Sequence, residues 1–233
     1  MRRLLSVPAA TLLLLGGLTA CGGGDDAAGG GEASPEELLS GAVTRLEETS
    51  GVRLTLSTDD TPDADAYLTR AEGVVTDAPA FEGTVSGKFM GIPADGVSVV
   101  ALGGTLYVDV FGTSQEFDPA DLCAPDPALL LDADAGVPEV LAAATDLTAG
   151  ESRRSEEDTS VIVTPYTATV PGDAVRNLLP CAPGDSFDAT FTFTDDDVLE
   201  GAEITGEFFD GSGPITYRIG ITEYDVEQEI SAP

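Results

Sequence analysis

The sequence predicts an α+β fold: a single large, strongly curved antiparallel β-sheet with helices packed on its concave face. After residue 50, most segments alternate apolar and polar residues, and short turns join one segment to the next. Such alternation is typical of antiparallel strands with one face in water. About four helical segments are available to cover the apolar face, three of them between residues 118 and 144. No linker or repeat divides residues 35–233, which we expect to form one domain.

The first twenty residues have the order of an export signal. Two arginines precede the apolar run Leu4–Leu15, which is too short for a stable transmembrane helix. The segment Leu18–Cys21 resembles the lipobox of bacterial lipoproteins, in which the cysteine sulfur is acylated and the cysteine becomes the first mature residue. We expect a signal peptide over residues 1–20 and a protein anchored through Cys21 at the extracytoplasmic face of the cell membrane. The alternative is an ordinary signal peptide with an incidental cysteine.

A tether and a helix follow the signal. Residues 21–34 are rich in glycine and acidic after Cys21, which predicts a flexible tether. Ser34 and Glu37 then form the pattern of a capping box around an early proline. Because apolar residues recur at helical spacing from there to Leu46, the domain is expected to open at residue 35 with an amphipathic helix.

The rest of the chain is expected to alternate between strands and short helices. The clearest hairpin joins residues 97–102 and 105–110 around Gly103-Gly104. Three short helices are expected near residues 118, 126 and 136, where a capping residue precedes an early proline, and a fourth at 171–179. The other expected strands are 52–56, 67–76, 81–89, 147–156, 159–169, 187–193, 202–208 and 215–221.

Charge and composition argue against several function classes. The formal net charge of −32 repels nucleic acid phosphates, so no nucleic-acid partner is expected. The absence of histidine removes the usual general base and the commonest zinc ligand. We expect neither an enzyme nor a metal site or other cofactor. Paired carboxylates are the alternative, but the densest acidic cluster, Asp195–Asp197, is expected to be a hairpin turn. Calcium there or at Asp59-Asp60 lacks support from EF-hand spacing.

Two cysteines remain once Cys21 is set aside. An exported protein folds in an oxidising environment, which favours a disulfide between Cys123 and Cys181. Closing a loop of about 58 residues would contribute about 4 kcal/mol to stability in the chain-entropy model. Two free, buried thiols are the alternative.

Glycines recur on two of the predicted inner faces. Gly83 and Gly87 alternate with large apolar residues in one strand, and Gly206 does so in another. Glycines on a concave face remove volume, so an apolar cavity could remain between sheet and helices. They could equally mark bulges and bends in a solid core. The spacing leaves both interpretations open.

A family resemblance bears on this choice. The segments 103–108 (GGTLYV), 117–122 (FDPADL), Asp126-Pro127 and 136–142 (GVPEVLA) resemble the central part of the LppX/LprAFG lipoproteins of actinobacteria. The opening helix, the strand after it and the order of elements are similar too. The resemblance implies a half-barrel like that of the LolA/LolB carriers. It also implies an apolar cavity that holds acyl chains of cell-envelope lipids or lipoglycans and moves them between membrane layers. A membrane transporter is a further candidate partner.

The strand faces give the residues expected to line such a cavity. Ordinary core residues are of the same types, and a one-residue slip would exchange the two faces of a strand. The candidates are Phe81, Val85, Phe89, Val97, Val99, Leu106, Val108, Ile204 and Ile219 from the sheet, with Val140 and Leu141 from the helical cover. The competing hypothesis is a surface lipoprotein with a solid core that serves as a structural or protein-interaction module.

Overall fold

The computed structural model describes residues 33–110, 112–156 and 158–233. The predicted signal peptide, Cys21 and the tether up to Glu32 lie outside the described residues. Residues 33–233 form one unit around a shared hydrophobic cluster.

Helix α1 spans Pro35–Glu48, as the capping pattern predicts. The Ser34 hydroxyl accepts a hydrogen bond from Glu37 N at 3.3 Å, and the Glu37 carboxylate accepts one from Ser34 N at 2.9 Å. The bond from the Ser34 backbone lowers the pKa of Glu37, because it favours the charged carboxylate. The side of the helix turned to the core carries the buried residues Leu38, Leu39, Ala42 and Leu46.

Within the described residues, twelve strands form a single sheet, and every strand pairing is antiparallel. The order across the sheet is β6-β5-β4-β3-β2-β1-β12-β11-β10-β9-β7, with β8 paired to β9. The strands are β1 (Gly51–Ser57), β2 (Tyr67–Thr76), β3 (Ala80–Phe89), β4 (Ile92–Leu102), β5 (Thr105–Val110), β6 (Thr113–Phe117), β7 (Thr145–Ala149), β8 (Arg153–Arg154), β9 (Ile162–Pro171), β10 (Ser186–Thr194), β11 (Leu199–Gly206) and β12 (Ile215–Tyr224).

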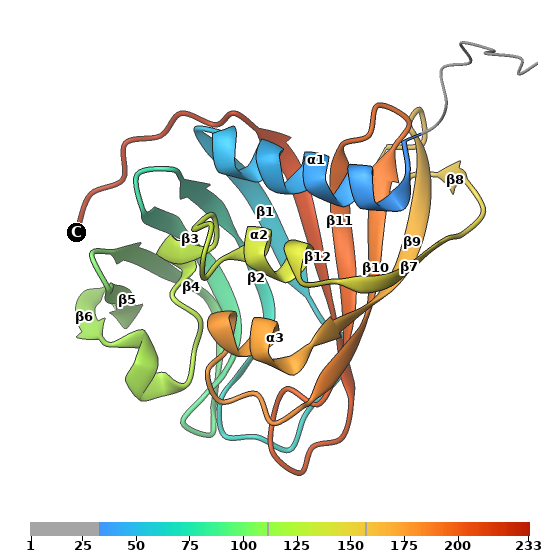
Figure 1. Cartoon of the computed structure of the whole chain (residues 1–233). Helices are drawn as coiled ribbons and strands as arrows, with labels where there is room; N and C mark the ends of the chain where they lie inside the picture. The colour runs from blue at the N-terminus through green and yellow to red at the C-terminus, as the bar shows by residue number, and fades with distance from the viewer. Residues whose placement is uncertain (1–32, 111, 157) are drawn as a thin grey trace, which may run out of the picture. The chain divides into compact units, whose positions relative to one another are not determined.

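The remaining helices cover one face of this sheet. The short helices η1 (Pro119–Leu122), η2 (Pro127–Leu129) and α2 (Val137–Ala142) lead the chain from β6 to β7, the two strands at opposite edges. Helix α3 (Gly172–Leu178) joins β9 to β10. Figure 1 shows α1, α2 and α3 in front of the same, concave side of the curved sheet. The predicted α+β half-barrel is confirmed.

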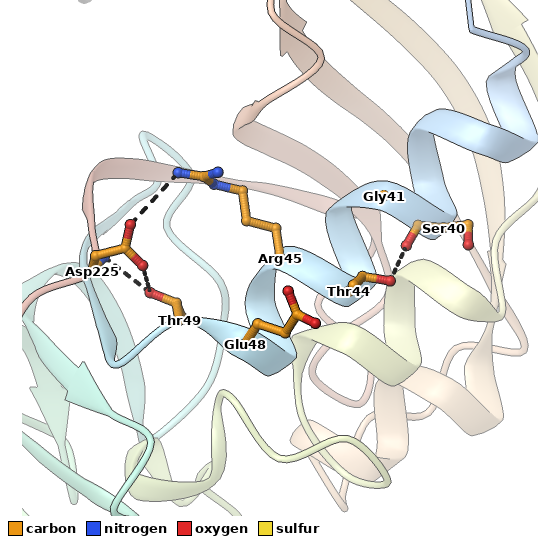
Figure 2. Close-up of a pocket in the computed structure, with 7 residues that line it drawn as sticks. All are labelled: Ser40, Gly41, Thr44, Arg45, Glu48, Thr49 and Asp225. Carbon is orange, nitrogen blue, oxygen red and sulfur yellow. Dashed lines mark hydrogen bonds and ion pairs between the residues drawn. The ribbon is translucent and has the colours of Figure 1, made fainter.

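The end of α1 is tied to the end of β12. Thr49, directly after α1, is 2% exposed, and its hydroxyl accepts a hydrogen bond from Asp225 N at 2.9 Å and donates one to Asp225 Oδ1 at 3.1 Å. Arg45 adds an ion pair to the same carboxylate at 3.8 Å (Figure 2). These contacts fix the first helix over the strands at the middle of the sheet.

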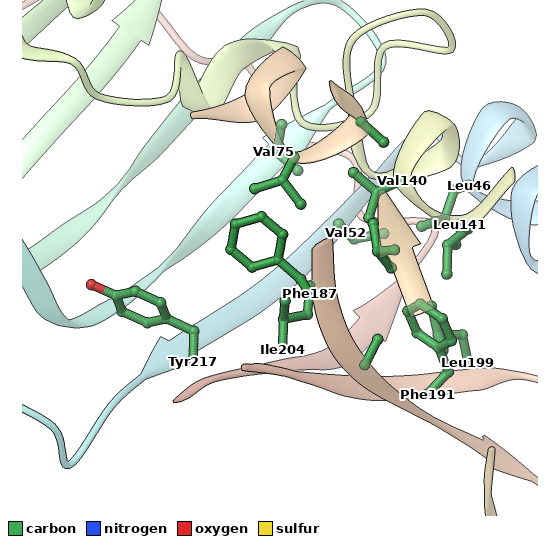
Figure 3. Close-up of a cluster of buried hydrophobic side chains, with 14 of the residues drawn as sticks. Leu46, Val52, Val75, Val140, Leu141, Phe187, Phe191, Leu199, Ile204 and Tyr217 are labelled. Atoms are coloured by element: carbon green, nitrogen blue, oxygen red, sulfur yellow. The ribbon is translucent and has the colours of Figure 1, made fainter. Parts of the chain in front are cut away.

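The largest buried side chains lie between the sheet and its helical cover. Phe187 and Phe191 of β10 and Leu141 of α2 are each 1% exposed. Figure 3 shows them with Val140 and Ile204 in one cluster. Inner face and helices therefore share a single core.

Aromatic rings occupy the space beside the inner-face glycines. A methyl group added at Gly206 would overlap the Phe187 ring, and one added at Gly83 would lie 2.7 Å from the Phe81 ring. At Gly87 the backbone of Tyr67 comes too close for any side chain, next to a shift in strand register. These glycines make room for rings and for a bulge. The interpretation of Gly83, Gly87 and Gly206 as open volume is wrong.

Several strands differ from the sequence prediction, among them β11, which spans Leu199–Gly206 and not residues 202–208. β4 begins at Ile92, not at residue 97, because the strand continues through a register shift near Gly96, where φ is +61°. β6 is not predicted, since its side chains are mostly exposed and do not alternate, as is common in edge strands. The segment 147–156 holds two short strands, β7 and β8, in place of one.

The predicted disulfide between Cys123 and Cys181 is confirmed, with the two Cα atoms 5.5 Å apart. It joins the end of η1 to the segment that follows α3. The bond therefore links two parts of the helical cover that are 58 residues apart in sequence.

The packing of rings over glycines predicts opposite effects of two glycine substitutions. Gly206→Ala should lower the free energy of unfolding by about 1–3 kcal/mol, because the fully packed Phe187 ring has no free space to move into. Gly41→Ala, in α1 with no neighbour within 4 Å, should raise it by about 1 kcal/mol through helix propensity. Urea unfolding of both variants checks this, and equal effects would contradict it.

Candidate functional site

The strand register places the predicted cavity residues of β3, β4 and β5 on one face. Val85 lies opposite Val97, and Val99 lies opposite Val108. Phe81 and Leu106 both lie opposite Ala101, which joins the two pairs into one apolar surface. The same face continues along the strand order into β1, β12 and β11. There Ile204 lies opposite Tyr217, and Ile219 lies opposite Ala202 and Leu56.

These residues differ in how deeply they are buried. Phe89, Val97, Val108 and Ile219 are half-buried and pack against the central cluster. The buried candidates are Phe81, Val85, Val99, Leu106 and Ile204 from the sheet, with Val140 and Leu141 from α2. The structure thus brings all eleven candidates to one interior. Contact of any of them with a ligand stays a prediction.

An aromatic group at one end of this interior is missing from the candidate list. The Phe187 and Phe208 rings lie 4.8 Å apart, and Tyr217 meets Phe208 edge-to-face at 5.2 Å. The Tyr217 hydroxyl donates a hydrogen bond to the Leu68 carbonyl at 3.0 Å, and burial raises the pKa of this phenol. All three residues lie on apolar strand faces of the sequence, so the alternation that selected Ile204 could have found them.

Two hollows lie along α1. The first, of about 540 Å³, lies between α1, α2 and β7, and its apolar lining includes Leu39, Val43, Leu147 and the predicted cavity residue Leu141. Its volume is within the usual range of ligand pockets, about 300–1,000 Å³. The second, of about 460 Å³, is polar and surrounds the Arg45–Asp225 ion pair (Figure 2). The apolar hollow between α1, α2 and β7 is thus a place where core side chains such as Leu39 and Leu141 border a surface opening.

The acidic positions weighed for chemistry have structural partners. Asp59 accepts a hydrogen bond from the Arg218 guanidinium at 2.9 Å, and Asp60 accepts one from the Thr216 backbone at 2.7 Å. The cluster Asp195–Asp197 forms the predicted turn between β10 and β11. Over residues 33–110, 112–156 and 158–233, no group of three His, Cys, Asp or Glu side chains is placed to hold a metal ion.

A comparison with models of protein families assigns this chain to a family. The model of the LppX_LprAFG lipoproteins matches residues 34–231. The chain belongs to the LppX_LprAFG lipoprotein family. The matched range contains every described helix and strand of the half-barrel and its helical cover. The resemblance that the sequence suggests is therefore confirmed.

Solved structures of two lipoproteins share the fold. LprF from Mycobacterium bovis aligns with a TM-score of 0.67 and 14% sequence identity, over 85% of this chain and 96% of that chain. Lipoprotein LppX from Mycobacterium tuberculosis aligns with a TM-score of 0.61 and 20% identity, over 85% of this chain and 100% of that chain. A comparison with curated protein sequences gave no match. None of the described helices of this LppX_LprAFG lipoprotein is long and apolar enough to cross a bilayer.

A partly buried tyrosine, Tyr224, predicts how stability depends on alkaline pH. Burial raises the pKa of Tyr224 to about 12 from 10.0, although the Arg45 guanidinium lies 4.6 Å from its ring centroid. A raised folded-state pKa means that the neutral phenol contributes stability below pH 10, and that this contribution is lost as the pH rises through about 12. Urea unfolding between pH 10 and pH 12 should show a smaller loss of unfolding free energy for Tyr224→Phe than for the wild type. Identical pH profiles of the two proteins would contradict the assignment.

Proposed function

We propose that this lipoprotein binds acyl chains of cell-envelope lipids or lipoglycans between its sheet and its helices, and transfers them across the envelope. The observation that carries the proposal is the continuous apolar inner face, formed in register by β3–β5, β11 and β12 and covered by α2. The family match, which spans this whole arrangement, supports it.

Burial of apolar surface is the driving force in this account. Each methylene moved from water into the interior contributes about 0.8 kcal/mol. The interior of this closed arrangement is lined by packed rings, so loading requires the cover to move away from the inner face. The pieces η1, η2 and α2 have only four, three and six residues. They are attached to the sheet by side-chain packing and not by strand pairing, which suits such a movement, and the disulfide links η1 to the segment after α3 within the cover.

The proposal includes where the protein acts. Acylation of Cys21 would hold it at the extracytoplasmic face of the cell membrane, and two or more acyl chains are needed for stable anchoring. Transfer makes and breaks no covalent bond, so no enzyme activity and no cofactor is part of it. A membrane transporter that hands over the lipid is a candidate partner.

A second function is favoured by the rings that fill the glycine sites. Phe81 and Phe187 pack over Gly83 and Gly206 as in an ordinary solid core. In that case the domain would serve as a structural or protein-interaction module and would never hold a lipid. Lipid occupancy separates the two functions.

Native mass spectrometry of protein purified from its own host tests the proposal. We expect bound lipid on the wild type, and at least about tenfold less on Val85→Trp and Val108→Trp, since each tryptophan fills the inner face near the centre of β3–β5. Val100→Trp is the matched control. Val100 lies next to Val99 in β4 but on the opposite face of the strand.

The outcomes are distinct as long as the variants fold, which circular dichroism and urea unfolding establish. Wild type free of lipid would favour the solid-core module. Equal occupancy in wild type and in both inner-face variants would place the lipid elsewhere. Because Val108 is half-buried, its variant keeps the test valid if Val85→Trp does not fold.

The anchor is tested separately from the cavity. Cys21→Ala removes the only side chain expected to be acylated, so the protein should leave the membrane fraction while its lipid occupancy is unchanged. Fractionation of host cells followed by lipid extraction measures both quantities. Retention in the membrane fraction of a variant from which residues 1–20 have been removed would show that Cys21 is not the anchor.

A further inference from the structure

The turn between β3 and β4 carries the most exposed large hydrophobic side chains of the described residues. Met90 is 82% exposed and Ile92 is 69% exposed. The other exposed large hydrophobics of this part of the chain, Leu129 and Ile162, are each 37% exposed. We refer to Met90, Gly91 and Ile92 as the hairpin tip.

The choice of methionine in this turn is unfavourable for the backbone. Met90 and Gly91 both have positive φ, +51° and +79°, between the paired residues Phe89 and Ile92. Two-residue turns of this kind prefer Asn, Asp or Gly, because other side chains are strained there. An exposed methionine is therefore not explained by the turn itself.

The tip is held in a fixed position by the loop between β1 and β2. Gly91 N donates a hydrogen bond to the Asp65 carbonyl at 2.8 Å. Lys88, the sole lysine of the chain, donates one to the Ala64 carbonyl at 3.0 Å. Because these bonds fix the turn, its exposed side chains do not fold back onto the protein.

Apolar residues connect the tip with the interior. The tip, the loop 58–66 and the loop 207–214 all lie at one end of the sheet, since β12 begins where β1 ends. At this end Leu68, Phe89 and Phe209 are half-buried and pack against the central cluster. Phe209 also meets Tyr67, the neighbour of Lys88 across the strands, at 6.4 Å. The apolar inner face thus continues outward to the tip.

We infer that the hairpin tip is a docking element that inserts Met90 and Ile92 into a lipid surface of low negative charge. Its size favours lipid over a protein partner: stable protein interfaces bury about 1,200–2,000 Å², which a two-residue projection cannot supply. A bilayer accepts such a projection, because each apolar side chain that leaves water contributes independently of shape.

The charges around the tip define which lipid surface fits. Asp63 and Asp65 of the neighbouring loop and Asp210 of the loop 207–214 are exposed, and the whole chain carries −32. Anionic headgroups would repel this end of the domain. Zwitterionic or uncharged headgroups would not.

The inference goes beyond the proposed function, although the predicted anchor would assist it. The twelve peptide bonds from Cys21 to Ala33 span at most about 40 Å, which exceeds the length of a ten-residue strand, about 33 Å. An anchored chain can therefore turn the tip toward the membrane that holds it. The tether would also raise the effective concentration of the hairpin tip at the membrane surface, so a weak affinity of the tip for lipid is enough for docking.

Single tryptophans test the inference, because the chain contains none. The predicted mature protein, residues 21–233 with Cys21→Ala and therefore without an acyl anchor, is mixed with phosphatidylcholine vesicles and with phosphatidylglycerol vesicles. Ile92→Trp should show a blue-shifted emission and quenching by brominated phosphatidylcholine, and a weaker response to phosphatidylglycerol. Ile162→Trp is the control. It lies at the opposite end of the sheet, since β9 starts there, and should not respond.

Flotation with the same vesicles gives a second readout on the native side chains. Met90→Ser and Ile92→Ser should each weaken partitioning into phosphatidylcholine by about tenfold, and Leu129→Ser and Ile162→Ser should not. Unchanged partitioning of the tip variants, equal emission shifts at residues 92 and 162, or stronger binding to phosphatidylglycerol would each overturn the inference. Lipid occupancy is measured independently, so failure here leaves the proposed function standing.

Discussion

The fold depends on the pairing of its first strand with its last. β1 and β12 lie side by side over almost their full length, although more than 150 residues separate them in the chain. This pairing joins the β1–β6 meander to the strands β7–β12, so the inner face is one surface rather than two. The buried Thr49 hydroxyl and the Asp225 backbone close the same junction from the helix side. Such distant pairing is slow to form, because its loop-closure entropy is large.

The continuous concave face creates the need for a cover, and the cover explains the rest. Strands with one apolar face must bury it, and the chain does so with α1, with the crossing segment from β6 to β7, and with α3. The disulfide links the crossing segment to the chain after α3. A cover that is packed on the sheet and not paired with it can separate from it. The proposed lipid-binding function requires this separation, whereas the solid-core alternative does not.

Much of the fold follows from the sequence, because alternation and capping are local signals. The Ser34–Glu37 capping box and the strand faces that carry Val85, Val99 and Ile204 are examples. Features that depend on how strands pair and pack against one another do not follow. The ring of Phe187 over Gly206 requires β10 and β11 to be in register, and β6 is a strand because β5 is beside it. Cys21 is predicted by its motif alone and lies outside the described residues.

The central claim is that acyl chains lie against the inner face of the half-barrel. Photo-crosslinking with a fatty acid that carries a diazirine near its terminal methyl group, followed by peptide mapping, tests it most directly. The account predicts adducts on inner-face residues such as Val97 and Val108, and on Leu141 of α2. Adducts confined to the outer face of the sheet, or to the polar hollow around Arg45, would contradict it.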